Sequence, residues 1–405
     1  MSRSVVIVGA GQAGYQTAIS LRQGGFSDDI VLIGDEPFLP YQRPPLSKAY
    51  LLGKIDVDGL IFRSTEFYEQ QKIQLIHGKA TAVDRTNKRV QVADGTSFDY
   101  GHLILATGAR NRPFSVPGSD ARRVHGLRSM KDANDLKQEI AEARHAVVVG
   151  AGFIGLEFAA VARSLGLEVD ILDMADRAMA RAVSDQVSQF FADAHSAWGS
   201  RLRFRRGVAH IDTENGRAAS VQTTAGESIP AELVVYGIGV IPNTELAIDA
   251  GLEVANGILV DSYLVTSDSD ISAIGDCVLF PSVHAGGQAR LESVQNAVDQ
   301  GRAVAARLLG KPDVYGALPW FWSDQADLKL QMVGLSTGYD ETVMLGRTED
   351  RSFTNLLFRK RQLIAIECVN RAGDFMAARK MMSQHVTLTP DVASRPGFEL
   401  RSWKG

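Results

Sequence analysis

Two sets of glycines in this sequence are spaced to bind the diphosphate of a dinucleotide. One set is Gly9, Gly11 and Gly14, and the other is Gly150, Gly152 and Gly155. A backbone that approaches a diphosphate closely needs glycine, because a side chain would block the N–H groups, and the N-terminus of a following helix adds a favourable partial charge. The sequence therefore predicts two dinucleotide sites.

An acidic residue follows each glycine set at the distance expected for a ribose contact. Asp35 lies 21 residues after Gly14, and Asp173 lies 18 residues after Gly155. A carboxylate at this position binds the ribose hydroxyls and repels a 2′-phosphate, so Asp173 predicts a preference for NADH over NADPH. Arg177 is the alternative, because a nearby arginine can accommodate that phosphate.

Each glycine set lies between a short β-branched run and a helical stretch, and a second strand precedes the acid. This order indicates two βαβ units. A later apolar run ends at Asp276, a helix is expected over 293–309, and strands with a late helix near 375–382 follow. We expect an α/β fold with two Rossmann-like domains and a C-terminal α+β domain. The expected boundaries are 1–108 with 236–313 for the first domain, 109–235 for the second and 314–405 for the third.

The composition narrows the functional classes. The 405 residues are 45% hydrophobic, and 43 basic against 47 acidic residues give a net charge of −4. This balance gives no global field for nucleic acid or a membrane surface. Cys277 and Cys368 are far apart and are expected to be buried, and no histidine or cysteine spacing predicts a metal site. The first apolar run begins at residue 4, so we expect no signal peptide and a cytoplasmic protein.

The whole chain resembles the FAD-dependent NADH–ferredoxin reductases, which are flavoproteins with two dinucleotide-binding domains of the glutathione-reductase-like kind. The resemblance is most specific in the segments 41–48, 150–157, 237–243, 273–277, 291–297 and 320–325. It implies an oxidoreductase that passes electrons from NADH through one non-covalently bound FAD to a [2Fe-2S] ferredoxin. Such ferredoxins serve a haem-thiolate monooxygenase or a ring-hydroxylating oxygenase.

The resemblance also assigns cofactor-binding roles. On the FAD side it implies diphosphate contacts at the first glycine set, a ribose contact at Asp35, a ribityl contact at Asp276 and a backbone N–H from Val294 to the flavin pyrimidine. The other residues implied at the FAD are Ala13, Arg43, Lys48, Ala80, Ala106, Gly108, Arg128 and Trp320. Taken singly, Arg43 and Arg128 could equally be surface charges.

Lys48, Glu157 and Trp322 are the residues that the resemblance places at the chemistry. Its members carry a lysine–glutamate pair near flavin N5, where hydride arrives, and an aromatic segment at the flavin edge. The alternative for Lys48 and Glu157 is a structural salt bridge between domains, and the alternative for Trp320 and Trp322 is an interdomain core. The loop 38–43 contains no cysteine, so electrons are expected to leave the flavin directly.

Two other functions remain open. A rubredoxin reductase shares this architecture, and an NADH-responsive flavoprotein of the apoptosis-inducing-factor type would act by interaction. For the ferredoxin reading, we expect a small acidic partner that docks on a local basic patch. Arg302 ranks first in that patch, and the other candidates are Arg307, Lys311, Arg371, Arg379 and Lys380. The sequence does not predict the oligomeric state.

Overall fold

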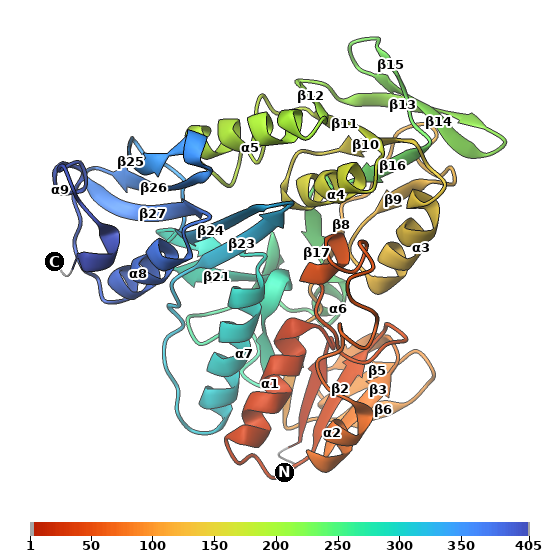
Figure 1. The fold of residues 1–405 in the computed structure, drawn as a ribbon. Coiled ribbons are helices and arrows are strands. Elements are labelled where there is room, and N and C mark those ends of the chain that lie inside the picture. The colour runs from red at the N-terminus through yellow and green to blue at the C-terminus, as the bar shows by residue number, and fades with distance from the viewer. Residues whose placement is uncertain (1–3, 404–405) are drawn as a thin grey trace. The chain divides into compact units, whose positions relative to one another are not determined.

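The computed structural model describes residues 4–403 and divides them into two compact units (Figure 1). The first unit contains residues 4–42, 57–110 and 241–319. The second unit contains residues 43–56, 111–240 and 320–403. The expected division into three domains is finer than these units and stays a prediction.

The first unit is built around a five-stranded parallel sheet. Its central strand β1 (Val5–Val8) is buried along its whole length, as expected for a run of β-branched residues in a parallel sheet that is covered on both faces. It pairs in parallel with β2 (Ile30–Gly34) and β7 (His102–Leu105), and β3 (Ile73–His77) and β20 (Ile271–Ala273) extend the sheet on either side. The carboxyl ends of all five strands therefore meet at one edge.

Two helices of the first unit lie side by side, α1 (Gln12–Gln23) and α7 (Val294–Leu308) (Figure 1). Their close approach needs Gly301, since a Cβ there would lie 2.9 Å from the Thr17 hydroxyl and 3.0 Å from the Ala13 carbonyl oxygen. The helix predicted over 293–309 is thereby confirmed. The remaining elements are η1 (Pro44–Ser47, which belongs to the second unit), α2 (Thr65–Gln70), β4 (Ala80–Asp84), β5 (Arg89–Val92), β6 (Ser97–Asp99), α6 (Glu245–Asp249), β18 (Val254–Ala255), β19 (Gly257–Leu259), η2 (Gly275–Cys277), β21 (Val278–Ser282) and β22 (Gly287–Ala289).

The second unit repeats the βαβ plan in another five-stranded parallel sheet. Strand β10 (His145–Val149) leads through α4 (Phe153–Ser164) to β11 (Glu168–Asp173), which pairs with β10 in parallel. The sheet is completed by β12 (Arg201–Phe204), β16 (Leu233–Tyr236) and β9 (Val124–Gly126). Other elements of this region are α3 (Met130–Ile140), α5 (Asp185–Ala197) and the antiparallel strands β13 (Val208–Glu214), β14 (Arg217–Thr223) and β15 (Ser228–Pro230).

The C-terminal part of the second unit is a five-stranded antiparallel sheet with helices, as the sequence predicts. Helix α8 (Ala372–Ser383) packs on it, and the expected late helix is therefore confirmed (Figure 1). The strands, in order across the sheet, are β23 (Trp320–Gln325), β24 (Leu328–Gly334), β27 (Gln362–Val369), β26 (Ser352–Arg359) and β25 (Glu341–Arg347). Short helices are η3 (Thr348–Asp350), α9 (Pro390–Ala393) and η4 (Leu400–Ser402), and β8 (Ala109–Asn111) and β17 (Val240–Pro242) lie where the chain passes between the units.

Cys277 and Cys368 are both free and fully buried, as expected. Across residues 4–403, no helix is both long and apolar enough to cross a membrane.

Candidate functional site

The first glycine turn joins β1 to α1 and leaves a cradle open at its middle glycine. A Cβ on Gly9 would lie 2.0 Å from the Ala106 carbonyl oxygen, and a Cβ on Gly14 would lie 1.9 Å from the Gly9 carbonyl oxygen. Gly9 and Gly14 are therefore required for packing. At Gly11, by contrast, no described residue other than its two chain neighbours has an atom within 4 Å of the Cβ position. This open position at a helix N-terminus fits a diphosphate.

The N-terminus of α1 keeps its positive end available to an anion. Its N-cap is Gly11, which offers no side-chain cap, and its first turn contains no acidic residue. Asp35 is exposed directly after β2, and Ala80 begins β4 just beyond the neighbouring β3. Asp35 follows the carboxyl end of β2, and Ala80 follows the carboxyl end of β3. Because both strands run parallel to β1, these residues lie at the same edge of the sheet as the glycine turn.

The other predicted FAD residues of the first unit also lie around α1. The Ala106 backbone N–H donates to the Val8 carbonyl, and Gly108 follows it at the end of β7. Asp276 lies in η2, whose Gly275 would place a Cβ 3.2 Å from the Cβ of Ala13. Val294 is the first residue of α7, the helix that packs against α1. Sheet and helices thus gather the predicted contacts that lie far apart in sequence.

The second unit contains a matching cradle between β10 and α4. A Cβ on Gly150 would lie 2.5 Å from the Gly237 carbonyl oxygen, and one on Gly155 would lie 2.0 Å from the Gly150 carbonyl oxygen. At Gly152 the nearest atom is 3.9 Å away, so this position is open. Helix α4 has Gly152 as its N-cap, and no acidic residue occupies its first turn. The same features that fit a dinucleotide diphosphate therefore occur twice.

Asp173 lies at the end of β11 and reaches the second cradle directly. Its carboxylate accepts hydrogen bonds from the backbone N–H of Ala151 at 2.6 Å and of Ala175 at 2.7 Å. Arg177 is engaged elsewhere: it donates to the carbonyls of Val183 and Ala180 and lies 2.9 Å from Asp185. The loop therefore uses the Arg177 guanidinium for its own carbonyls, which weakens the alternative reading of that residue.

Arg205 is a basic residue near Asp173 that the sequence reasoning missed. It is exposed after β12, and its backbone N–H donates to the Ala175 carbonyl. The next residue, Arg206, donates its backbone N–H to the Asp173 carbonyl and lies 3.5 Å from Glu227. Only the parallel pairing of β11 with β12 brings these arginines to the acid, so no local sequence signal marks them.

Lys48 and Glu157 form a close ion pair within the second unit. Lys48 Nζ lies 2.9 Å from Glu157 Oε2, with the lysine side chain 18% exposed and the glutamate 2% exposed. The Ser47 hydroxyl donates to the same oxygen at 2.5 Å, and the Ser323 hydroxyl donates to Oε1 at 2.7 Å. Such a buried carboxylate with charged and hydroxyl donors suits a functional site. Sequence reasoning gave the pair a role, whereas the two serines lie in the segments 41–48 and 320–325 that carry the resemblance but were given no role of their own.

The remaining predicted residues of the second unit divide into two groups. Arg43 donates to the Arg128 carbonyl at 2.9 Å, so these two predicted FAD residues lie together. Trp320 and Trp322 lie on one face of β23 with their ring centroids 5.7 Å apart, and Arg379 stacks over Trp320 at 4.5 Å. Alternation along the strand turns Ser323 to the other face, so Trp322 does not point toward Glu157.

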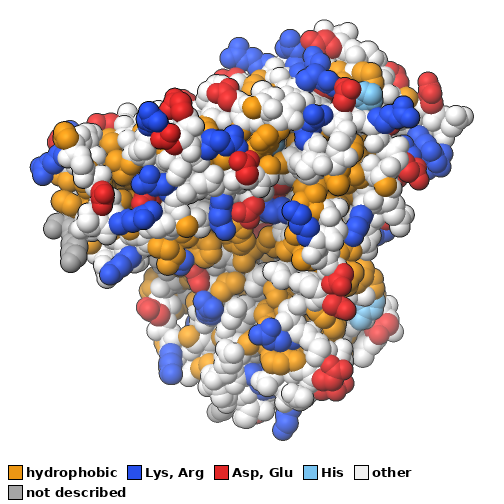
Figure 2. All heavy atoms as spheres, viewed as in Figure 1, with side chains coloured by type: hydrophobic (Ala, Val, Ile, Leu, Met, Phe, Trp, Pro, Cys, Tyr) orange, Lys and Arg blue, Asp and Glu red, His pale blue; other side chains and the backbone are white. Residues whose placement is uncertain are grey.

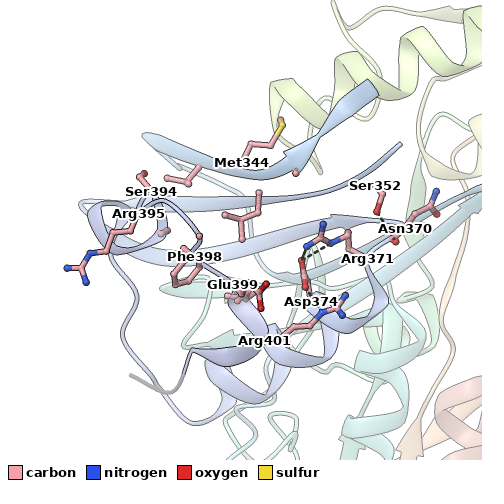
Figure 3. A pocket seen from close by; sticks show the side chains of 16 residues that line it. Met344, Ser352, Asn370, Arg371, Asp374, Ser394, Arg395, Phe398, Glu399 and Arg401 are labelled. Carbon is pink, nitrogen blue, oxygen red and sulfur yellow. Dashed lines mark hydrogen bonds and ion pairs between the residues drawn. The ribbon is translucent and has the colours of Figure 1, made fainter. Parts of the chain in front are cut away.

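A hollow of about 820 Å³ lies in the C-terminal part of the second unit (Figure 3). Among the charged residues in its lining, Arg371 and Arg401 both contact Asp374. The buried Asp374 accepts hydrogen bonds from Arg371, Arg401 and Thr354, each at 2.9 Å. Arg371 therefore pairs with the buried Asp374 while its side chain stays 31% exposed, and its place in a docking patch remains a prediction.

The predicted docking residues on α7 have different surroundings. The Arg302 side chain is 62% exposed and lies 3.7 Å from Asp299. Arg307, however, donates to the Ser272 hydroxyl and contacts His102 at 3.3 Å. The helix turns part of the Arg307 side chain toward the sheet, so Arg307 is less available to a partner than Arg302, and the docking patch stays a prediction. Figure 2 shows basic and acidic side chains interspersed on the face in view, so any attraction of a partner must be local.

Comparison with known proteins finds family matches over most of the chain. Residues 3–301 match the pyridine nucleotide-disulphide oxidoreductase family, and residues 320–403 match the reductase C-terminal family. Rhodocoxin reductase from Rhodococcus erythropolis is 48% identical over 98% of this chain and 93% of its own.

Two solved structures are also similar. The ferredoxin reductase for the CYP199A2 system from Rhodopseudomonas palustris has a TM-score of 0.97 at 48% identity, covering 99% of each chain. The covalent putidaredoxin reductase–putidaredoxin complex gives a TM-score of 0.95 at 37% identity, covering 98% of this chain and 97% of that one.

The matched family implies FAD and NAD(P)H as cofactors, and the two open glycine cradles fit two such dinucleotides. The α/β fold, with two parallel sheets followed by an antiparallel C-terminal sheet, agrees with both family matches. The chain therefore belongs to the pyridine nucleotide-disulphide oxidoreductase family with a reductase C-terminal domain, and it is a ferredoxin reductase of the putidaredoxin and rhodocoxin reductase type.

Proposed function

We propose that this enzyme oxidises NADH in preference to NADPH and passes the electrons, through one non-covalently bound FAD per chain, to a small acidic [2Fe-2S] ferredoxin. The ferredoxin would serve a haem-thiolate monooxygenase or a ring-hydroxylating oxygenase. Relatives support this choice by name: one is a reductase for the CYP199A2 system, and another is bound covalently to putidaredoxin.

One helix carries the observation that most supports the proposal. The N-cap of helix α4 is Gly152, the open position of the second cradle, and Glu157 follows five residues later on the buried side of the helix. The diphosphate contact and the carboxylate paired with Lys48 therefore share one rigid element. A dinucleotide held at the N-terminus of α4 would have its distance to the ion pair fixed by that helix.

The chain's own residues have separate tasks in this proposal. Bound FAD supplies the chemistry that joins hydride transfer from NADH to one-electron transfer toward an iron–sulfur cluster. Lys48 would hold a positive charge near the site of hydride arrival, and Glu157 would fix that ammonium in place. Val294, as the first residue of α7, would direct a backbone N–H and the positive end of that helix toward the pyrimidine ring.

The preference for NADH follows from the charges at the end of β11. Asp173 contacts the second cradle through Ala151, so a 2′-phosphate bound there would meet a carboxylate. Arg177 is held by Ala180, Val183 and Asp185 and would have to leave them to neutralise that phosphate. Arg205 is the exposed base that could oppose this preference.

The first test is spectroscopic and needs only the purified protein. We expect a yellow protein that carries one FAD per chain, releases it on denaturation and loses its flavin absorbance when NADH is added without oxygen. NADPH should bleach the flavin more slowly at equal concentration. A colourless protein that cannot take up FAD would sink the proposal, whereas bleaching at equal rates would overturn only the coenzyme preference.

A further inference from the structure

Glu157 stands at one end of a buried hydrogen-bonded chain that crosses the second unit. The Ser323 hydroxyl donates to Glu157 Oε1 at 2.7 Å, and Gln325 Nε2 donates to the Ser323 oxygen at 3.2 Å. His195 Nε2 lies 2.9 Å from Gln325 Oε1. Each of these four side chains is at most 3% exposed. The chain links helix α4, strand β23 and helix α5 through side chains alone.

The strand β23 explains how these residues meet. Phe321, Ser323 and Gln325 alternate onto one face of the strand, where Phe321 packs on Phe153 of α4 at 4.6 Å between ring centroids. The same face presents Ser323 to Glu157 on α4 and Gln325 to His195 on α5. A register shift of one residue would turn all three side chains away.

The direction of every hydrogen bond in this chain can be assigned. Gln325 places its Nε2 toward the Met179 sulfur at 3.9 Å as well as toward Ser323, and a thioether can only accept. Gln325 Oε1 must therefore accept from His195 Nε2. Burial lowers the pKa of His195 to about 4, so the ring is neutral near pH 7 and carries its proton on Nε2. Ser323, which accepts from Gln325, has its one hydrogen left for Glu157.

We propose that Ser323, Gln325 and His195 are positioning residues for the hydride-transfer site, because their aligned donors hold the Glu157 carboxylate in one orientation against Lys48. With Ser47 and Lys48 on Oε2 and Ser323 on Oε1, the carboxylate receives three donors from two separate segments. This inference rests on the proposed function of the Lys48–Glu157 pair.

The polar side chains of this hydrogen-bonded network indicate a functional role rather than a contribution to stability alone. An apolar core at these positions would need no partners, whereas each buried polar group must find one. His195 Nδ1 finds none among the described residues, so the network is held at a cost. Buried networks with such a cost occur where side-chain orientation matters to a site.

The test compares variants of the FAD-loaded enzyme. Ser323→Ala removes the donor to Glu157, Ser323→Thr keeps a hydroxyl, and Gln325→Leu cuts the chain one step further away. Ser272→Ala is the matched control, since Ser272 is also a fully buried strand serine and contacts Arg307 and His102 instead. Glu157→Gln is included as the reference for the ion pair itself.

Three measurements are made on each variant: the rate of flavin reduction at saturating NADH in a single turnover, the midpoint of thermal unfolding, and the infrared carboxylate band that is lost in Glu157→Gln. We expect Ser323→Ala to slow reduction about 10-fold, the lower end of what loss of a supporting hydrogen bond costs at a metal site. It should also shift the carboxylate band. Ser323→Thr should restore the rate to within about twofold, and Ser272→Ala should leave rate and band unchanged.

The outcomes separate the positioning role from the proposed function. If Glu157→Gln is slow but Ser323→Ala and Gln325→Leu keep the wild-type rate and band, the positioning role is overturned while the ion pair keeps its role. If Glu157→Gln itself reduces its flavin at the wild-type rate, the proposed role of the pair is overturned, and the positioning role with it. Gln325→Leu decides the question if a Ser323 variant does not fold.

Discussion

The Ser47 hydroxyl donates a 2.5 Å hydrogen bond to Glu157 Oε2 across 110 residues of sequence. Lys48, its neighbour, reaches the same oxygen at 2.9 Å. Ser47 is the last residue of the short helix η1 and Lys48 directly follows it, and the first residues of this helix, Pro44 and Pro45, fix the backbone where the chain needs no N–H donor. The segment 43–56 therefore places a hydroxyl and an ammonium group against one carboxylate oxygen of α4.

Removing either member of the ion pair should slow hydride transfer. In Lys48→Ala the buried Glu157 keeps only its serine donors, and in Glu157→Gln the ammonium loses its counter-charge. We expect each variant to reduce its flavin with NADH about 10-fold or more slowly in a single turnover, which corresponds to about 1.4 kcal/mol in the barrier. Lys131→Ala is the control, because that lysine is 77% exposed and pairs with Asp135 four residues on. A loss confined to FAD affinity or thermal stability would favour the purely structural salt bridge.

Replacing Asp173 should narrow the preference for NADH. Asp173→Asn removes the charge that opposes a 2′-phosphate and weakens the contact to the ribose, so the ratio of kcat/KM for NADH over NADPH should fall about 10-fold. Ferricyanide serves as the electron acceptor, and Asp193→Asn on α5 serves as the control, since Asp193 accepts only from Gln189 four residues away. Equal use of both coenzymes by the wild type would contradict the prediction, and Arg205→Ala would then show whether that base is responsible.

A charge reversal at Arg302 should act on the partner step alone. Arg302→Glu should slow ferredoxin reduction several-fold at low salt, because exposed charges act mainly on association rate, and the difference should shrink as salt screens them over about 8–10 Å. NADH–ferricyanide turnover should stay within about twofold of wild type. Lys131→Glu provides an equally drastic control on α3. If ferredoxin turnover ignores both the substitution and the salt, the docking patch lies elsewhere or is chiefly apolar.

The carboxyl of Glu367 predicts a pH-dependent stability. It is 1% exposed, and burial raises its pKa to about 7 although Ser184 donates to both of its oxygens. A glutamate whose pKa is higher in the folded than in the unfolded chain stabilises the fold while it is protonated, and this contribution is lost as pH rises toward and through 7. Relative to wild type, Glu367→Gln should therefore become more stable as the pH rises from 5 to 8, by an amount on the order of 2–3 kcal/mol, since about 1.4 kcal/mol accompanies each unit of the pKa difference.

Urea unfolding of both proteins at several pH values measures this difference. The other titrating groups, including His102 and His195, cancel between the two proteins because they are common to both. A difference in the free energy of unfolding that is constant with pH would contradict the assignment of Glu367 as the titrating group.

Local signals in the sequence predicted both βαβ units, the α7 helix and the α8 helix, because glycine spacing and apolar periodicity are properties of short segments. The order Gly150, Gly152, Gly155 and Asp173 sufficed to predict a second dinucleotide site. Ser323, Gln325 and His195 could not be found in this way. They meet only after β23 packs on α4 and α5, and a serine or glutamine within a strand has no distinctive spacing.

The sequence also could not predict which basic residues of the expected docking patch are exposed. Arg302 and Arg307 are five residues apart on one helix, and as a sequence they look alike. Helical rotation turns Arg307 toward Ser272 and His102 while Arg302 stays exposed. Which basic residues are available to a partner therefore depends on tertiary packing, which charge and spacing do not encode.

A stopped-flow measurement can follow electrons from NADH through bound FAD to an iron–sulfur partner. The FAD-loaded enzyme is reduced with one equivalent of NADH without oxygen and is then mixed with an oxidised [2Fe-2S] ferredoxin or, in parallel, with an oxidised rubredoxin. We expect flavin absorbance to return as the ferredoxin is reduced, at a rate sufficient for turnover and faster than with rubredoxin. Flavin that stays reduced in the presence of a panel of ferredoxins, or that is reoxidised only by rubredoxin, would contradict electron transfer from FAD to a [2Fe-2S] ferredoxin.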